Sequence, residues 1–196
     1  MALVRKYRRP LVLGLAAAAF SVGVALAQGP PLAERIQTCG VCHGEDGNSK
    51  MENIPSIAGQ PAFFIVNQLI LMREGVRPVE AMMPFVKDLK DDEATALAEH
   101  FAKLPPKPSD EKLDPALVKR GTALSEERRC GSCHLPTLAG QEQIPRVAKQ
   151  RVDYLIRSLK EFRDGTRLGA DTNMSVPVAG LPDADLAALA HYAASR

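Results

Sequence analysis

The sequence lacks tryptophan, and aromatic residues make up only 5% of its 196 residues. It also lacks an excess of charge, because 25 Lys and Arg stand against 23 Asp and Glu, so nothing in the composition indicates binding to nucleic acid. Alternation of apolar and polar residues, the pattern of half-buried strands, is nearly absent. With 45% apolar and 24% charged residues, the chain is otherwise of ordinary globular composition, and the missing strand pattern favours an all-α fold.

Long apolar runs are missing except near the N-terminus, where residues 1–27 have the pattern of a secretory signal peptide. Four basic residues lie between positions 5 and 9, an apolar stretch spans residues 11–26, and Ala25-Leu26-Ala27 resembles a cleavage site. An uncleaved membrane anchor is the alternative, although a span takes about 20 apolar residues. We expect a periplasmic mature chain, with membrane contact only peripheral or through an uncleaved N-terminus. Removing residues 1–27 changes its net charge from +2 to −2.

Cysteine is scarce, but all four cysteines fall in one pentapeptide that occurs twice. It reads Cys39-Gly-Val-Cys42-His43 and Cys130-Gly-Ser-Cys133-His134. Cys-x-x-Cys-His is the attachment sequence for c-type haem. On a helix, positions i, i+3 and i+4 share one face, so two thiols can bond to one porphyrin while the histidine faces its iron. Disulfides or a redox Cys-x-x-Cys site are less favoured, because the βαβ pattern of such redox folds is missing. We therefore predict two covalent haem c groups.

The rest of the chain repeats with a period of about 90 residues. Ile54-Pro55 matches Ile144-Pro145, the segment 73–77 matches 163–167, and farther on the offset becomes 92. A period this long indicates two similar domains rather than a solenoid. The proline-rich, charged stretch after Leu104 predicts a short, stiff connection. The expected organisation is an N-terminal domain at 28–106, a linker at 107–115 and a C-terminal domain at 116–196.

Each domain is predicted to be a small helical fold around one haem. Apolar spacing predicts helices near residues 32–43, 61–73 and 91–101, with counterparts in the second half at 154–162 and 186–193. About 80 residues are marginal for an unaided core. A buried haem would supply the missing apolar volume.

The sixth position of each iron is expected to be filled by methionine. Met174 is the single methionine of the second half, and Met82 occupies the same register, since each lies seven residues before a matching leucine. Met83 is one residue out of this register and is the alternative to Met82. His100 and His191 are the rival ligands, although their positions do not match between the repeats. A methionine ligand would favour electron transfer, whereas an open position would suit catalysis or gas binding.

The proximal histidines need a partner for their other ring nitrogen. Pro55 and Pro145 follow His43 and His134 by 12 and 11 residues and are expected to offer backbone carbonyls. Four arginines also recur in register, and they either contact haem propionates or belong to solvated helix ends. They are Arg73, Arg77, Arg163 and Arg167.

Together these segments resemble the dihaem cytochrome c4 family across essentially the whole mature chain. The most similar run comprises residues 39–49 and 54–60, and the blocks 82–93 and 174–185 look like that family's methionine loops. The resemblance implies two class I cytochrome c folds whose haems face each other across the interface. It also implies periplasmic electron transfer, commonly from a quinol-oxidising complex to a terminal oxidase. One departure is the sequence after His134, which lacks the Gly-x-Asp-Gly turn that follows His43.

The sequence thus predicts an electron carrier rather than an enzyme. The main alternative is the dihaem cytochrome subunit of a periplasmic dehydrogenase, such as a flavin-linked sulfide dehydrogenase. A dihaem peroxidase would be larger and would need an open iron, and a haem-based ligand sensor would need an open iron as well. We therefore expect redox proteins as partners.

Overall fold

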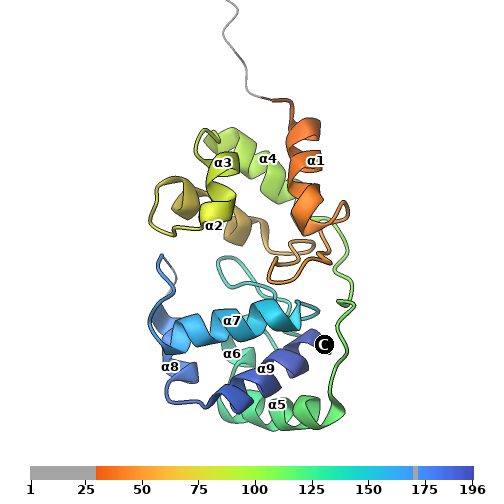
Figure 1. The fold of residues 1–196 in the computed structure, drawn as a ribbon, viewed down its shortest axis with the longest axis vertical. Coiled ribbons are helices and arrows are strands. Elements are labelled where there is room, and N and C mark those ends of the chain that lie inside the picture. The colour runs from red at the N-terminus through yellow and green to blue at the C-terminus, as the bar shows by residue number, and fades with distance from the viewer. Residues whose placement is uncertain (1–29, 170–171) are drawn as a thin grey trace, which may run out of the picture.

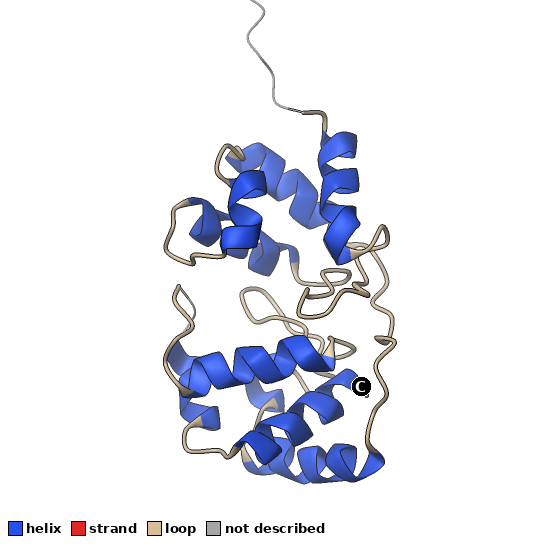
Figure 2. Cartoon of the chain, in the orientation of Figure 1, coloured by secondary structure: helices blue, strands red, loops and turns tan. Residues whose placement is uncertain are grey.

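A computed structural model describes residues 30–169 and 172–196; the signal peptide predicted at 1–27 lies outside them. The described chain folds into two helical units, one above the other in Figure 1. It contains no strand, only an isolated bridge between Gln141 and Ile144 (Figure 2). The elements are α1 (Leu32–His43), α2 (Ala62–Arg73), η1 (Glu80–Met82), α3 (Met83–Val86), α4 (Asp91–Ala102), α5 (Pro115–Glu127), α6 (Gly131–His134), α7 (Val152–Arg163), η2 (Thr172–Met174), α8 (Ser175–Val178) and α9 (Asp183–Ala194).

The two units repeat the same order of elements, as the sequence predicts, except that α5 and α6 stand where the N-terminal unit has α1 alone. Helix α7 follows α2 at an offset of 90 residues, whereas η2, α8 and α9 follow η1, α3 and α4 at an offset of 92. Both haem motifs end a helix, since α1 ends at His43 and α6 ends at His134. The change in offset falls between α2 and η1 in the N-terminal unit and between α7 and η2 in the C-terminal unit, where the connecting segment is two residues longer.

The C-terminal unit is built on the packing of α5 against α9. Gly121 lies at this crossing, and a Cβ there would collide with the backbone carbonyl of Ala188. Glycine is therefore required for the close approach of the two helices. Asp114 starts α5 by accepting hydrogen bonds from the backbone N–H groups of Ala116 and Leu117, ahead of Pro115 at the first helical position.

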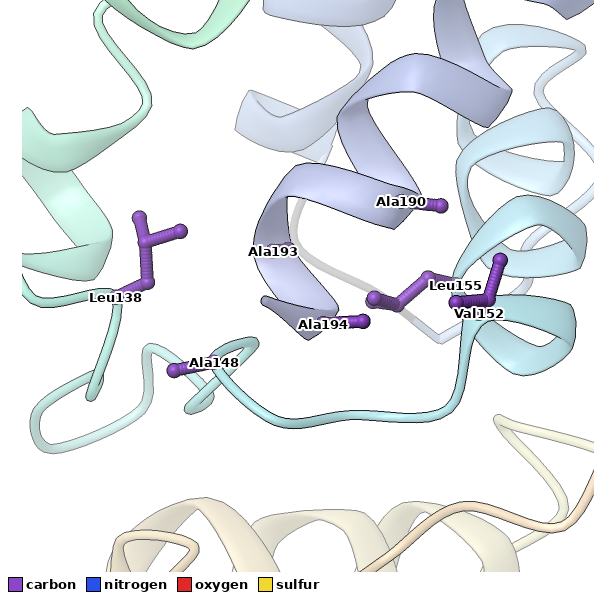
Figure 3. Packing of buried hydrophobic residues seen from close by; sticks show 7 residues of the cluster. All are labelled: Leu138, Ala148, Val152, Leu155, Ala190, Ala193 and Ala194. Carbon is purple, nitrogen blue, oxygen red and sulfur yellow. The ribbon is translucent and has the colours of Figure 1, made fainter. Parts of the chain in front are cut away.

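The apolar core of the C-terminal unit lies between α7, α9 and the loop after α6. Figure 3 shows the alanines of α9 between Leu138 on one side and α7 on the other. The core cluster consists of Leu138, Ala148, Val152, Leu155, Ala190, Ala193 and Ala194.

Arginine–carboxylate pairs tie the first and last helices of each unit together. In the N-terminal unit Arg35 Nη2 lies 3.0 Å from Glu93 Oε1. The C-terminal counterpart pairs Arg120 with Asp185, which is Glu93 shifted by 92 residues. Glu93 also accepts a hydrogen bond of 2.9 Å from the Lys90 backbone N–H and so closes the start of α4.

Residues 103–114 connect the units along one side of the molecule (Figure 1). This segment is fixed at both ends rather than free. The Lys107 backbone N–H donates to Asn48 Oδ1 at 2.8 Å, and Glu111 accepts from the N–H groups of Val152 and Asp153 at 2.7 and 2.9 Å. Glu111 thereby neutralises the positive end of α7. The close approach of the two units, expected from the short linker, is present.

None of the helices in the described part of the chain is long and apolar enough to cross a membrane.

Candidate haem sites

His43 lies at the last turn of α1 with its side chain buried. Its Nδ1 is 2.8 Å from the carbonyl oxygen of Pro55, which is the partner that the sequence spacing predicts. Burial lowers the pKa of His43, so the imidazole is neutral. A neutral ring with Nδ1–H donated to a carbonyl leaves the lone pair of Nε2 for a metal.

His134 repeats this arrangement in the C-terminal unit. It ends α6 and is buried, and its Nδ1 is 2.8 Å from the carbonyl oxygen of Pro145. Its pKa is also lowered by burial. The two prolines begin the segments that face each other between the units, so the proximal histidines are held by interface loops.

The four cysteines lie on the same helix ends, and none of them is paired in a disulfide. Cys39, Cys42 and Cys130 are half-buried, and Cys133 is exposed. Burial raises the pKa of Cys39 and of Cys130, so both stay protonated at neutral pH. In the part of the chain that the structure describes, nothing around Cys39 or Cys130 therefore activates these two thiols as nucleophiles.

An apolar cavity opens beside His134 in the C-terminal unit. The space inside the cavity and its open mouth together amounts to about 500 Å³. Cys130, His134 and Met174 all contribute to its wall, so one thiol, one imidazole and one thioether border the same cavity. The remaining wall is mostly aliphatic and includes Leu138, Leu155 and Leu189.

Met82 and Met174 occupy equivalent places in the fold. Met82 is the last residue of η1 and directly precedes α3, and Met174 is the last residue of η2 and directly precedes α8. Their backbones have similar conformations, with φ and ψ of −92° and −21° for Met82 and −71° and −21° for Met174. Met83 instead begins α3, in the place that Ser175 takes in α8.

The loop after each haem motif keeps one shape despite the departure in sequence. Gly44 and Gly47 have φ of 87° and 73°, and the matching Leu135 and Leu138 have φ of 67° and 57°. Both loops also use equivalent hydrogen bonds. The carbonyl of Gly47 accepts from the backbone N–H groups of Ile57 and Ala58, and that of Leu138 accepts from those of Val147 and Ala148. Leucine at φ 67° and ψ 157° is strained, since that region is essentially limited to glycine.

We expect Leu135→Gly to raise the free energy of unfolding of the C-terminal unit by about 1 kcal/mol. Relief of strain worth about 1–3 kcal/mol is partly offset by the greater entropy of unfolded glycine. Gly44→Ala is the matched reverse change and should destabilise the N-terminal unit, because its Cβ would meet the carbonyl of Asn48. Thermal unfolding followed by circular dichroism checks both. A lower melting temperature for Leu135→Gly would contradict the assignment of strain.

The recurring arginines divide into two pairs. Arg73 and Arg163 belong to helix ends. Arg73 donates to the Leu89 carbonyl and pairs with Asp91. Arg163 likewise donates to the Leu181 carbonyl and pairs with Asp183. Arg77 and Arg167 lie instead where the two units meet. Gly169 lies against the backbone of residues 76 and 77, and Arg167 Nη2 donates to the Tyr154 hydroxyl at 3.2 Å.

The two rival histidines are engaged in other contacts. His191 Nδ1 accepts a hydrogen bond of 3.2 Å from the backbone N–H of Asp114, and the His100 ring packs edge-on against Phe101. Neither belongs to the wall of the cavity beside His134.

Sequence reasoning did not assign a role to Gln60 and Gln150. Both are buried between the units and pair with backbone groups of the opposite unit. The sequence does contain a signal for an equivalent role, because the two glutamines are separated by the 90-residue offset of the repeat.

The geometry fits a covalent haem c in each unit. A neutral histidine with a fixed Nδ1 adjoins a pair of cysteines in both, and in the C-terminal unit an apolar cavity has a methionine in its wall. Within the described residues, no cluster of three or more His, Cys, Asp or Glu side chains offers a site for a bare metal ion. The fold and the two sites therefore define a dihaem c-type cytochrome.

Comparisons with known proteins place this cytochrome in a family. The family model described as "Cytochrome c" matches residues 118–195, and that described as "Cytochrome C oxidase, cbb3-type, subunit III" matches residues 25–101. Cytochrome c4 from Pseudomonas aeruginosa is 33% identical over 193 residues, which cover 93% of each chain. The "Thiosulfate dehydrogenase electron acceptor" of Thiomonas intermedia is 30% identical, over 96% of this chain and 91% of that one.

Comparison with solved structures supports the same family. Reduced recombinant cytochrome c4 from Pseudomonas stutzeri superposes with a TM-score of 0.75 at 30% identity, over 84% of this chain and 96% of the other. The chain belongs to the dihaem cytochrome c4 family and carries two covalently bound haem c groups. The predicted all-α fold with two cytochrome c domains is confirmed, and the chain is an electron-carrier cytochrome.

Proposed function

We propose that this protein carries electrons in the periplasm with His43 and Met82 as axial ligands of one haem iron and His134 and Met174 as those of the other. Cys39 and Cys42 would attach the first haem, and Cys130 and Cys133 the second. The observation that carries the proposal is the cavity whose wall holds Cys130, His134 and Met174 together. A bound haem supplies a one-electron couple at its iron.

The protein's own contribution is to orient the ligands and exclude water. The carbonyls of Pro55 and Pro145 fix both imidazole planes and increase the basicity of their Nε2 atoms. The aliphatic wall around His134 keeps its iron site dry, and filling both axial positions leaves no place for a substrate. For the first iron we favour Met82 over Met83, because Met82 shares the helix-junction position of Met174.

We also propose Arg77 and Arg167 as the cations that face the haem propionates. They lie near each other at the interface, and each lowers the pKa of Tyr154. Burial raises the pKa of that tyrosine, but the two guanidinium groups prevail and bring it to about 8. A site that favours an anionic phenol also favours carboxylates.

For this function we propose the domains expected from the sequence: an N-terminal domain at 28–106, a linker at 107–115 and a C-terminal domain at 116–196. We also propose that a signal peptide is cleaved after residue 27. Electrons would come from a quinol-oxidising complex and pass to a terminal oxidase. The second candidate is an electron-accepting partner or subunit of a periplasmic dehydrogenase, of the flavin-linked sulfide type or of the type named by the Thiomonas intermedia relative. Co-purification with a flavoprotein, or faster reduction by a thiosulfate-oxidising enzyme than by a quinol-oxidising complex, would favour the second candidate.

A spectroscopic experiment tests the ligand assignment. The oxidised protein should show low-spin haem with the methionine–iron charge-transfer band, and the reduced protein should not bind CO readily. A high-spin ferric signal in the purified wild-type protein would contradict the proposal.

A further inference from the structure

Two buried glutamines join the units by reciprocal hydrogen bonds. Gln150 of the C-terminal unit accepts from the Ser56 backbone N–H at 2.7 Å and donates to the Ser56 carbonyl at 2.8 Å. Gln60 of the N-terminal unit accepts from the Arg146 N–H at 2.9 Å and donates to its carbonyl at 2.9 Å. The exposed fractions of all four residues lie between 2% and 4%, so neither pair competes with water.

Each glutamine binds the peptide group that holds a proximal histidine. The carbonyl of Pro55 and the N–H of Ser56 belong to one peptide group, and so do the carbonyl of Pro145 and the N–H of Arg146. One chain of hydrogen bonds therefore runs from His43 Nδ1 through the Pro55–Ser56 peptide to Gln150 Oε1. The other runs from His134 Nδ1 through the Pro145–Arg146 peptide to Gln60 Oε1.

The electronic consequence follows from cooperativity. A peptide whose N–H donates to a strong acceptor has a more negative carbonyl oxygen, since hydrogen bonds in series polarise one another. A more negative carbonyl draws the Nδ1 proton of histidine more strongly and raises the basicity of Nε2. A more basic ligand stabilises ferric over ferrous iron, because second-shell hydrogen bonding is one of the levers on haem potential.

We propose that Gln150 sets the reduction potential of the N-terminal haem and that Gln60 sets that of the C-terminal haem. Each is a positioning residue that acts across the domain interface on the iron of the other domain. The inference rests on the proposed function only in taking His43 and His134 as ligands. It gives the interface a redox role, because any partner that shifts the two domains would change both potentials.

The test compares leucine and glutamate at the same positions. Gln150→Leu removes the acceptor and should favour ferrous iron in the N-terminal haem by about three- to tenfold at a fixed electrode potential; tenfold corresponds to about 59 mV for one electron. Gln150→Glu keeps an acceptor, now charged, and should shift the same haem in the opposite direction. The Arg146 guanidinium, 3.5 Å from the Ser56 carbonyl, favours the ionised carboxylate.

Redox titration followed by the haem methyl NMR signals resolves the two potentials. The mirror variants Gln60→Leu and Gln60→Glu should move the C-terminal haem more than the N-terminal one. Gln141→Leu, on an exposed side chain of the same loop, is the control and should move neither. Small-angle scattering shows whether a leucine variant separates the domains. If it does, the haem potentials of the glutamate variants, which keep the side-chain size, test the proposal instead.

The proposal is overturned if leucine and glutamate shift a haem in the same direction, as a purely structural role would, or if each glutamine acts mainly on the haem of its own domain. Failure of the axial-ligand assignment looks different. It would show in the wild-type protein as a missing methionine–iron band before any glutamine is changed.

Discussion

Met174→Ala is expected to lower the reduction potential of the C-terminal haem by at least about 100 mV. Axial ligands shift haem potentials over a total range of about 0.8 V, so a change of this size is expected when one ligand is lost. The thioether is a soft ligand that stabilises ferrous iron, and its loss admits water or another harder ligand. The methionine–iron band of this haem should disappear, and the reduced form should bind CO. Met174 borders the same cavity as His134, which is why the effect is assigned to this residue.

The N-terminal domain supplies a sharper comparison, because two adjacent methionines compete. Met82→Ala should produce the same loss in the N-terminal haem, whereas Met83→Ala should leave both potentials close to those of the wild-type protein. Both side chains are half-buried, so the two variants remove similar packing. The reverse result would move the ligand to Met83 and break the structural equivalence of η1 and η2.

Arg151→Met is expected to lower the free energy of unfolding by about 1–3 kcal/mol, as for the loss of hydrogen bonds between charged groups, because the guanidinium is buried while its carboxylate partners are partly exposed. The guanidinium, with 6% of its side chain exposed, lies 2.8 Å from Asp153 Oδ2 and 3.2 Å from Asp110 Oδ1. It also donates to the carbonyl of Ser49 at 3.5 Å, so it joins both domains and the linker. Methionine keeps much of the volume and leaves the carboxylates unpaired.

The pH dependence of this variant follows from Asp153. Burial raises the pKa of Asp153, but the Arg151 guanidinium and the backbone N–H groups of Asn53 and Tyr154 prevail, so the net pKa is lowered. A lowered carboxyl pKa stabilises the wild-type fold above the unfolded value of about 3.9, and that stability is lost as pH falls through the folded pKa. In Arg151→Met the burial effect should dominate and place the folded pKa of Asp153 above its unfolded value, so this carboxylate would destabilise the fold at neutral pH. The stability deficit of the variant should therefore be largest near neutral pH and should shrink as pH falls and Asp153 becomes protonated.

Arg157→Met is the matched control on α7. Arg157 is largely exposed, donates to the Asn53 carbonyl at 3.0 Å and pairs with Glu161, so its loss should cost no more than about 1 kcal/mol. Thermal unfolding and proteolysis of the 103–114 segment measure both variants. Equal stability of the two would show that the Arg151 cluster does not hold the interface.

The sequence predicts much of this fold because the signals are local. Helix α7 is amphipathic along its whole length, and the haem motif carries its own spacing. Helix α5 was not predicted, and it begins at Pro115, within the segment expected to be linker. The two Nδ1 contacts were also predictable, since the proline follows the histidine at nearly the same distance in each repeat. Repetition thus turns weak single signals into firm ones.

Contacts between the domains could not be predicted, because they depend on relative orientation rather than on spacing. Nothing local indicates that Gln60 meets Arg146, 86 residues away, or that Arg151 joins three segments. The loop after His134 is a different case. Its sequence suggests a new conformation, but the shared hydrogen bonds to Leu138 and Gly47 hold leucines in a backbone shape that glycine normally takes.

The most direct test of the account is the number and ligation of haems in the purified mature protein. A pyridine haemochrome assay combined with intact mass should give two covalent haems per chain, and the oxidised spectrum should show methionine-ligated, low-spin iron in both domains. One haem per chain, or a high-spin signal from either domain, would contradict it.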